Sequence, residues 1–174
     1  MYHGANRIGG NSLLSAIYSG NVASEEISGR KGGMHHPDFS SDLERERKLL
    51  ARNMDTRSHF PVMYMRDMLA ETMQKRLGIV RSEDNLAQGL NDIDYDLSIA
   101  ERIHYDSSVM PYFNYSLTAI LTLARATLTC ALERKESRGA HYRSDFPKTD
   151  EASGFATIIA YNTETAKPRL SLNF

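Results

Sequence analysis

Residues 82–103 read SEDNLAQGLNDIDYDLSIAERI, and their pattern is the clearest indication of the fold in this sequence. Its apolar residues recur at intervals of three or four positions, which places them along one stripe of a helix. They are Leu86, Leu90, Ile93, Leu97, Ala100 and Ile103. The box from Ser82 to Asn85 is a typical helix start, because a serine hydroxyl accepts a hydrogen bond from a free N–H of the first turn. The stretch therefore predicts an amphipathic helix with one buried face.

Two neighbouring stretches repeat this spacing, one on each side. The first follows Pro61 and ends before Gly78, a proline and a glycine where helices commonly begin and end. Its apolar residues are Val62, Met65, Leu69, Met73 and Leu77. The second follows Pro111, and its apolar residues are Phe113, Leu117, Ile120, Ala124, Leu128 and Ala131. Three long amphipathic helices with short connections can bury their stripes only against one another. The sequence therefore predicts a mainly α fold built on an antiparallel, spectrin-repeat-like three-helix bundle.

The segment before the bundle has a different character. Residues 1–34 hold seven of the eleven glycines, and Ser12 to Ala23 within them has the pattern of a short helix. Asn11 or Ser12 can cap that helix, and a surface linker is expected from Ser28 to His36. A further helix is expected from Ser40 or Ser41, with apolar residues at Leu43, Leu50 and Met54.

The segment after the bundle begins with a polar loop at residues 137–152. Phe155 to Tyr161 and Arg169 to Asn173 then carry alternating, β-branched and aromatic residues, separated by Asn162 to Pro168. This pattern predicts a terminal β-hairpin. Two strands alone are only marginally stable in water, so the hairpin needs a surface to lie on.

The composition excludes several classes of protein. Lys and Arg number 21 and Asp and Glu 22, a formal net charge of −1 that provides no basic field for nucleic acid. The single cysteine, Cys130, excludes an internal disulfide, and no metal site is predicted. The most apolar stretch, Ala119 to Leu132, is interrupted by Arg125 and by threonines, which favours a core helix over a membrane span. We therefore expect a globular, cytoplasmic chain with an inert core thiol at Cys130.

Charge is distributed unevenly along the chain. From Ser82 to Asp106 there are seven acids and one arginine, and from Arg125 to Lys148 six bases and three acids. A solvated acidic helix face beside a basic tail is one interpretation of this pattern. The other interpretation is a docking surface for a partner.

HGANRIGGNSLL, at residues 3–14, is the first candidate functional stretch. Glycines permit a tight loop with close backbone approach, and a helix begins directly after them. The free N–H groups of a helix start attract anions and electron-rich carbonyls, and Arg7 adds a planar fork suited to a carboxylate. These features predict an anion site, and a glycine loop that binds nothing is the alternative. The glycine spacing differs from that of a dinucleotide-binding loop.

ESRGAHYRSDFP, at residues 136–147, is the second candidate stretch. It places two arginines, a histidine and an aspartate within eight residues after a long helix. Capping of the helix C-terminus and salt bridges account for these charges at least as well as catalysis does. The helix dipole favours Arg138 and His141 near that end.

Two stretches together resemble the flavoprotein subunit of succinate dehydrogenase and fumarate reductase, whose wider family includes L-aspartate oxidase: HGANRIGGNSLL at residues 3–14 and RKESRGAHYRSDFPKTD at residues 134–150. The stretch from Met73 to Asp94 resembles the helical C-terminal domain of those proteins. The likeness extends as far as Asp150. Each motif is fairly specific, and the pair, about 130 residues apart with helices between, is highly specific.

The resemblance implies roles for several residues. Arg7 occupies the position of an arginine that binds a carboxylate of the dicarboxylate substrate, and Asn11, Ser12 and Leu13 occupy positions that meet FAD at a helix start. FAD would carry the hydride chemistry while the protein orients the substrate. The segment from Ser137 to His141 would help to join the helical domain to the flavin domain, without a catalytic role.

The resemblance also implies a larger assembly, because a dinucleotide-binding flavin domain and a capping domain precede this region in the family. Residues 1–36 would then be the tail end of the FAD-binding domain and a linker, 37–136 the helical bundle domain, and 137–174 the terminal loop and hairpin. An iron–sulfur subunit and a membrane anchor would complete a complex on the cytoplasmic side of the membrane. We expect the chain alone neither to bind FAD tightly nor to turn over substrate.

Three hypotheses about the function are considered. Gly9 and Gly10, together with the second motif, favour succinate dehydrogenase or fumarate reductase, although the direction of the reaction stays open. The second hypothesis is that the chain is a piece of an L-aspartate oxidase. The third, from another class, is a free-standing helical interaction module whose acidic helix docks a partner.

Overall fold

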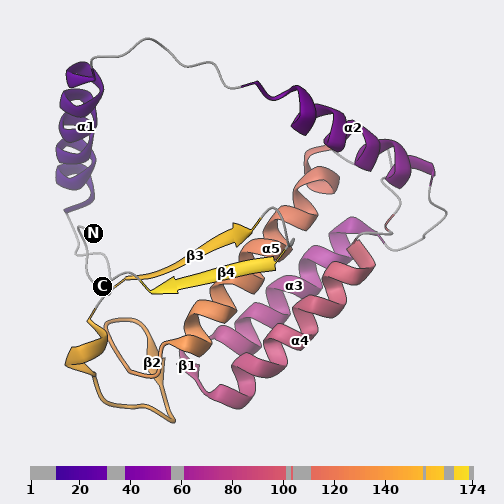
Figure 1. The fold of residues 1–174 in the computed structure, drawn as a ribbon. Coiled ribbons are helices and arrows are strands. Elements are labelled where there is room, and N and C mark those ends of the chain that lie inside the picture. Colours follow the sequence, from indigo (N-terminus) through magenta and orange to yellow (C-terminus); the bar gives the residue numbers. More distant parts are fainter. Residues whose placement is uncertain are drawn as a thin grey trace. The chain divides into compact units, whose positions relative to one another are not determined.

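The computed structural model describes residues 11–30, 38–55, 61–100, 103, 111–154, 156–162 and 167–172. The chain divides into two compact units, Met1–Ser41 and Asp42–Phe174. The first unit contains helix α1 (Asn11–Gly29), and helix α2 (Ser40–Asp55) begins at the boundary between the units (Figure 1). All further elements belong to the second unit.

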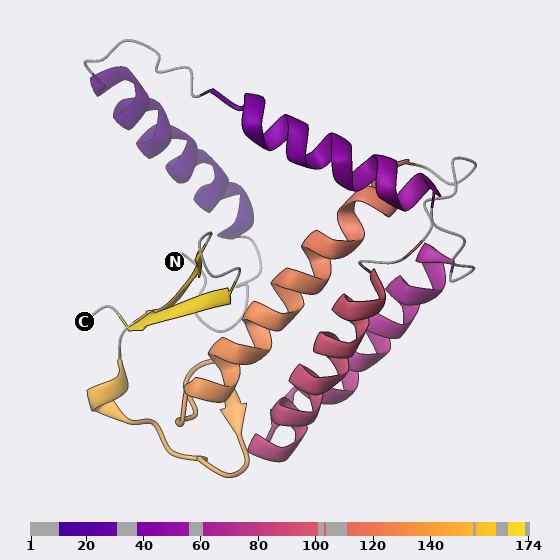
Figure 2. The same ribbon diagram turned by 45° about the vertical axis from the view of Figure 1, so that its right-hand side comes forward.

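Three helices of the second unit form the predicted bundle. They are α3 (Val62–Leu77), α4 (Glu83–Ala100) and α5 (Pro111–Glu133). Figures 1 and 2 both show them side by side with alternating directions, which confirms the antiparallel three-helix arrangement. The buried core consists of Val62, Met65, Leu69, Leu86, Ile93, Ala100, Ile103, Leu117, Leu121, Ala124, Leu128 and Ala131. Most of these residues lie on the stripes that the spacing predicts, because burial of apolar surface is what holds the helices together.

The helix bounds agree closely with the start and stop signals. Pro61 lies just before α3 with extended backbone angles, and α3 ends directly before Gly78. At the start of α4 the Ser82 hydroxyl accepts a hydrogen bond from the Asn85 N–H at 3.4 Å, as the box at residues 82–85 predicts. Helix α1 is longer than predicted, since it ends at Gly29 and not at Ala23. Most of the predicted linker, residues 31–36, lies outside the described residues.

Helix α5 is more apolar than the sequence interpretation expected, because it contains a window that meets the length and composition criteria for a membrane span. The window Ser116–Glu133 is long and apolar enough, by length and composition, to cross a membrane, with a mean hydropathy of 1.2. In the structure its stripe packs against α3 and α4, with Leu117, Leu121 and Leu128 fully buried. Burial in the bundle thus accounts for one stripe of α5, and 22% of the window is buried.

A parallel pair of very short strands was not predicted. Strand β1 (Val80–Arg81) follows α3, and strand β2 (Tyr142–Arg143) lies in the stretch predicted as a loop. Val80 pairs with Tyr142 and Arg81 with Arg143. Two-residue strands are too short to show any alternation in the sequence, so no pattern could reveal them.

The terminal hairpin is confirmed. Strands β3 (Thr157–Asn162) and β4 (Lys167–Leu172) are antiparallel, with Thr157 opposite Leu172 and Asn162 opposite Lys167. The separating segment is shorter than predicted, since both strands extend further into it. Strand β3 contacts α5, which supplies the surface that an isolated hairpin needs (Figure 1).

Gly89 on α4 faces side chains of both neighbouring helices. A Cβ atom at this buried position would lie 2.8 Å from Cβ of Arg76 on α3 and 3.0 Å from Cδ2 of Leu128 on α5. We expect Gly89→Val to lower the free energy of unfolding by about 1–3 kcal/mol, because the helices must move apart to admit the side chain. Urea unfolding of the purified chain measures this change. Asn91→Val, at an exposed position of the same helix, is the control, and an equal loss there would exclude the packing explanation.

Candidate functional site

The first candidate stretch lies at the N-terminus of α1. Asn11, Ser12 and Leu13 are the first three residues of this 19-residue helix, whose first turn carries no acidic residue. The Ser15 hydroxyl donates to the Asn11 carbonyl at 2.7 Å. Arg7 and the rest of the glycine loop lie outside the described residues. The partial positive charge at this helix start therefore has no acid beside it in the first turn.

Helix α1 has no buried residue, although it is rich in apolar side chains. Its exposed large apolar residues are Leu13, Leu14, Ile17, Tyr18, Val22 and Ile27. Positions 13, 14, 17 and 18 follow the spacing of one helix face. Leu13 alone leaves 70% of its surface accessible. A contiguous apolar face of this kind is typical of a surface that another part of a protein covers.

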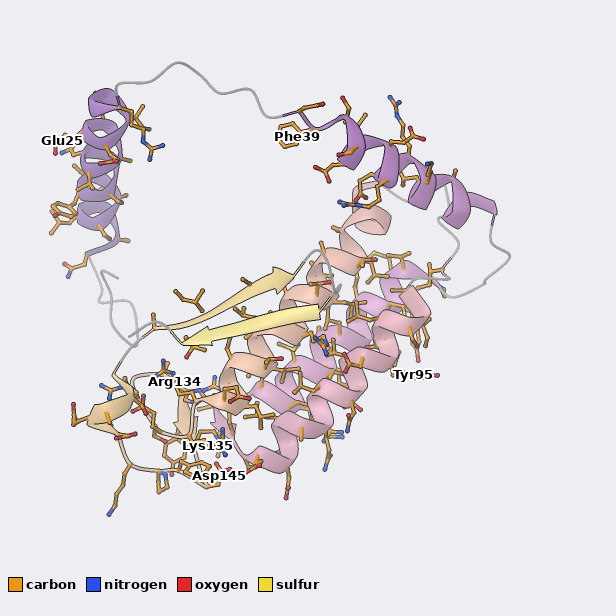
Figure 3. The ribbon with its side chains drawn as sticks, in the orientation of Figure 1. Glu25, Phe39, Tyr95, Arg134, Lys135 and Asp145 are labelled. Carbon is orange, nitrogen blue, oxygen red and sulfur yellow. The ribbon has the colours of Figure 1, made fainter. Side chains whose placement is uncertain are left out.

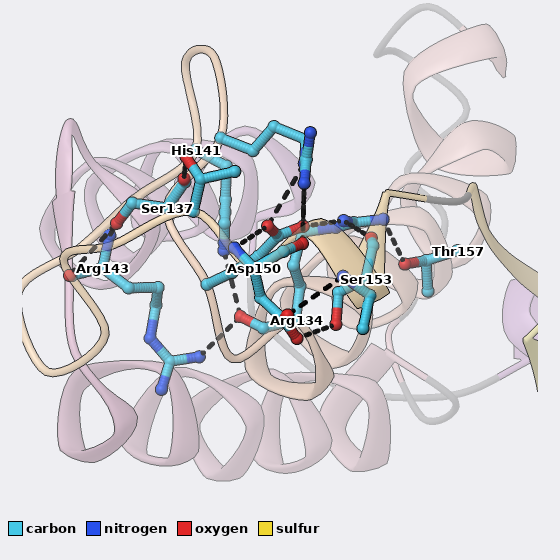
Figure 4. A network of polar contacts seen from close by, with 11 residues as sticks. Arg134, Ser137, His141, Arg143, Asp150, Ser153 and Thr157 are labelled. Atoms are coloured by element: carbon cyan, nitrogen blue, oxygen red, sulfur yellow. Dashed lines mark hydrogen bonds and ion pairs between the residues drawn. The ribbon is translucent and has the colours of Figure 1, made fainter.

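The second candidate stretch forms a polar cluster at the C-terminal end of α5 (Figure 4). Arg143 lies at its centre and is fully buried. Its Nη1 donates to the carbonyls of Ala131 and Leu132, both at 3.0 Å, and of Arg134 at 3.3 Å. These carbonyls have no partner within the helix, so Arg143 caps the end of α5. Nε2 of His141, one of the two residues that the dipole argument named, lies 3.3 Å from the same Arg134 carbonyl, while the contacts to Ala131 and Leu132 come from Arg143.

Asp145 completes the contacts of the Arg143 guanidinium. Nε donates to Oδ1 at 2.8 Å and Nη2 donates to Oδ2 at 2.7 Å, so the two side chains form a bidentate ion pair. Oδ2 also accepts the backbone N–H of Glu83 at 2.9 Å, at the start of α4. The arginine, followed by these backbone contacts, holds the pKa of Asp145 well below its usual range. One ion pair thus ties the end of α5 to the beginning of α4.

Glu136 is the second buried charge of the cluster and is fully inaccessible. Its carboxylate accepts from Nε of Arg138 at 3.0 and 3.2 Å, from Nη1 of Arg134 at 2.5 Å and from the N–H of Asp150 at 2.9 Å. The hydrogen bond from Arg138 is the largest cause that lowers the pKa of Glu136 to about 2. Burial acts in the opposite direction, but the donors outweigh it.

Arg134 extends the cluster to the hairpin. Besides Glu136, it donates to the Ser153 carbonyl at 3.0 Å and to the Thr157 hydroxyl at 3.0 Å, at the start of β3 (Figure 4). Figure 3 places Arg134 and Asp145 at the same end of the bundle. The cluster therefore links α4, α5 and the hairpin through side chains of one segment.

A tight turn brings the segment back on itself. Arg138 and His141 exchange backbone hydrogen bonds at 2.8 and 3.0 Å, and Gly139 between them has φ of 60°, a conformation that favours glycine. The Ser137 hydroxyl accepts from the Arg143 N–H at 2.9 Å and donates to the Phe146 carbonyl at 2.8 Å. Burial lowers the pKa of His141, which favours its neutral form.

The charged side chains of this cluster are occupied with one another and with backbone groups. Such an arrangement fixes the position of a chain segment, and it presents no nucleophile beside a free base. The structural interpretation of the second motif is the one that the geometry supports. Arg134 and Asp150, the two ends of this network in sequence, lie within residues 134–150, the stretch that carries the family resemblance, although no role was predicted for either.

The acidic stretch is not simply a solvated helix face. Asp92 pairs with Arg76 of α3 at 2.9 Å, and Asp94 pairs with Arg125 of α5 at 2.5 Å. Asp96 is buried. Among the residues that the structure describes, no group of three His, Cys, Asp or Glu side chains could hold a metal ion. Cys130 is half-buried, and burial raises the pKa of its thiol, which makes it a poor nucleophile at neutral pH.

Comparison with known proteins connects this architecture to flavoproteins. The chain is 31% identical over 172 residues to the succinate dehydrogenase flavoprotein subunit of Bacillus subtilis. The matched region covers 91% of the chain and 29% of that protein. The chain is 33% identical over 146 residues to an L-aspartate oxidase of Pyrococcus abyssi, covering 84% of the chain and 24% of that protein. The chain thus spans less than a third of the length of these curated relatives.

A solved structure has the same fold. The Mycobacterium smegmatis Sdh1 complex in its apo form matches with a TM-score of 0.76 and 18% identity, covering 96% of the chain and 30% of the matched one. The family described as fumarate reductase flavoprotein C-term matches residues 66–173, from α3 to the hairpin. Because this match spans more than half of the sequence, the chain belongs to the C-terminal region family of succinate dehydrogenase and fumarate reductase flavoproteins, whose wider membership includes L-aspartate oxidase.

Proposed function

We propose that the chain is the C-terminal part of an FAD-dependent oxidoreductase that interconverts succinate and fumarate. The observation that carries this proposal is the start of α1, where Asn11, Ser12 and Leu13 open a long helix directly after the glycine loop that contains Arg7. Family membership supplies the flavoprotein context. In this proposal the chain alone does not turn over substrate, because the residues that hold most of the flavin belong to preceding domains.

The start of α1 suits a flavin. Its free N–H groups and positive dipole end have no acid beside them in the first turn, so they can stabilise negative charge on an electron-rich carbonyl. Bound FAD would supply the hydride transfer. Asn11, Ser12 and Leu13 would bind it, and the Arg7 guanidinium would hold a substrate carboxylate in a two-pronged contact. Nothing in the first turn of α1 conflicts with these roles.

The exposed apolar face of α1 supports the proposed domain organisation. Residues 1–36 would belong to the flavin domain, whose apolar surface would cover Leu13, Leu14 and Ile17. The helical domain would be residues 37–136 and the loop with the hairpin 137–174. The segment from Ser137 to His141, which the polar cluster fixes at the end of the bundle, would help to join the two domains.

The intact protein would work in a complex. The proposed partners are an iron–sulfur subunit, which would take electrons from the flavin, and a membrane anchor. The complex would lie on the cytoplasmic side of the membrane. The Mycobacterium smegmatis relative of this fold is itself described as part of a complex, which is consistent with such partners.

L-Aspartate oxidase is the second candidate function. The Pyrococcus abyssi enzyme is as similar in sequence as the Bacillus subtilis subunit, at 33% against 31% identity. Gly9 and Gly10 in the N-terminal loop favour the succinate and fumarate assignment. Assays of the intact flavoprotein with succinate, fumarate and L-aspartate distinguish the two, and turnover of L-aspartate alone would reverse the order of the candidates.

Arg7→Gln in the intact flavoprotein tests the substrate role. We expect kcat/KM for the dicarboxylate to fall by about ten- to a hundredfold, because a charge-assisted hydrogen bond contributes about 1.5–3 kcal/mol. The absorbance spectrum of the bound flavin should stay unchanged, since Arg7 contacts the substrate. Arg45→Gln, at an exposed position of α2, is the matched control. Unchanged kinetics in Arg7→Gln would remove Arg7 from the site.

The free-standing interaction module is the remaining alternative. The coding DNA around Met1 distinguishes it from the flavoprotein proposal. An open reading frame that continues upstream through a glycine-rich flavin domain supports the proposal, and an adjacent gene for an iron–sulfur subunit favours succinate or fumarate. A stop codon directly before Met1 would require a separate flavin-binding chain to be found.

A further inference from the structure

A groove of about 370 Å³ runs between α3 and α4. None of the residues that line it belongs to the polar cluster or to the start of α1. Thr72 lines it from α3, and Asn91, Asp92, Tyr95 and Asp96 line it from α4. Tyr95, labelled in Figure 3, is 65% exposed on α4. The groove thus combines oxygen-bearing side chains with one accessible aromatic ring.

Asp96 is the unusual member of this groove. It leaves only 3% of its surface accessible and lies three residues after Ile93 and four before Ala100, on the core stripe of α4. Its carboxylate makes no hydrogen bond or ion pair with any residue in the described part of the chain. A buried carboxylate is costly unless a donor or cation compensates it.

The charges around the groove do not provide that compensation. Glu71, Lys75 and Arg76 of α3 also line it. Arg76 donates to Asp92 at 2.9 Å and to Gln88 at 2.5 Å, and within the described part of the chain neither Lys75 nor Arg76 forms an ion pair with Asp96. Burial and, to a smaller extent, Asp92 raise the pKa of Asp96, so the surroundings disfavour its charged form. Helix α4 contains five acidic residues and no lysine or arginine between Glu83 and Ala100. A cation from outside would relieve this imbalance.

We propose that this groove receives an arginine side chain of a partner protein, with the Asp96 carboxylate as its anchor. A guanidinium matches a carboxylate with two parallel hydrogen bonds and is more weakly hydrated than an ammonium, so it enters a half-closed groove at lower cost. The Thr72 hydroxyl and the Asn91 amide oxygen can accept its remaining N–H groups. The exposed Tyr95 ring offers a face on which a guanidinium can stack. None of the residues that line the groove is among those assigned to flavin or substrate.

A titration of the isotopically labelled full chain with blocked arginine, N-acetyl-arginine-N-methylamide, tests the proposal by NMR. We expect saturable shifts of the amides that line the groove. Blocked citrulline, which has nearly the same shape without the charge, should bind at least about tenfold more weakly. Equal binding of citrulline, or no saturation with arginine, would overturn the proposal. Equal binding of blocked lysine would overturn the assignment to arginine.

Variants of α4 locate the anchor. Asp96→Asn should weaken binding of blocked arginine by at least about tenfold. Asp94→Asn removes the same charge from an exposed residue that pairs with Arg125, and it should leave binding unchanged. An Asp96→Asn variant that binds like the wild type would contradict the proposed anchor. If that variant failed to fold, the comparison of arginine with citrulline on the wild-type chain would decide alone.

Discussion

Arg143→Met should lower the free energy of unfolding by about 3–5 kcal/mol, the largest single loss that we expect from any side chain of the bundle. The methionine fills much of the same space, but it cannot donate to the three carbonyls at the end of α5. It also leaves the Asp145 carboxylate, which caps α4, without its ion-pair partner. Chemical denaturation of the purified chain at neutral pH measures the loss.

Two further variants separate charge from geometry at this position. Arg143→Lys restores a positive charge, but an ammonium cannot make the bidentate contact with Asp145 and reach the carbonyls at the end of α5 at the same time. We therefore expect this variant to recover only part of the lost free energy of unfolding. Arg45→Met removes an exposed arginine that pairs with Asp42 on α2, and it should cost less than about 1 kcal/mol. Equal losses for Arg143→Met and Arg45→Met would contradict the central role of Arg143.

The bundle could be predicted because burial and sequence spacing have the same cause. A helix of the bundle buries one stripe, so Ala124, Leu128 and Ala131 of α5 recur at intervals of four and three and are all buried. Local chemistry also reveals the starts and ends, since Ser82 satisfies a free N–H of α4 and Gly78 follows the last residue of α3. These signals involve near neighbours in sequence and need no knowledge of the tertiary structure.

The partners of the charged residues could not be predicted in the same way. Arg143 reaches carbonyls 9 to 12 residues away, and Asp145 reaches the Glu83 N–H across 62 residues. Strands β1 and β2 pair across a similar separation. Such contacts depend on where the bundle brings distant segments together, which composition and periodicity do not encode.

Asp96 shows a different limit of prediction from sequence, because the acidic residues around it suggest exposure to solvent. The predicted stripe runs through Leu97, and an aspartate in an acidic run is most simply interpreted as a solvated residue. In the structure the carboxylate is buried. Leu97 is only partly buried, so the buried stripe passes through Asp96, three residues after Ile93 and four before Ala100. An ionisable residue on such a stripe is a candidate binding site.

Glu136→Gln is the second large effect, with an expected loss of about 2–3 kcal/mol at neutral pH. The amide keeps the shape of the side chain, but it loses the charge that Arg134 and Arg138 share and places an NH₂ group against their donors. Glu44→Gln, which breaks an exposed pair with Lys48 on α2, is the matched control and should change stability by less than about 1 kcal/mol.

The pH dependence of stability distinguishes the charge of Glu136 from its packing. The pKa of Glu136 is about 2 in the folded chain and has its ordinary value of 4.5 in the unfolded one, so the unfolded state takes up the proton first as the pH falls. Its contribution is therefore fully present above about pH 4.5 and is lost as the pH falls towards about 2. Glu136→Gln has no such group, so the gap between wild type and variant should narrow across this window. Asp145 keeps some acid sensitivity in both chains, because its own pKa is lowered. A gap that stayed constant from neutral pH down to about pH 2 would mean that Glu136 stabilises the fold through packing alone.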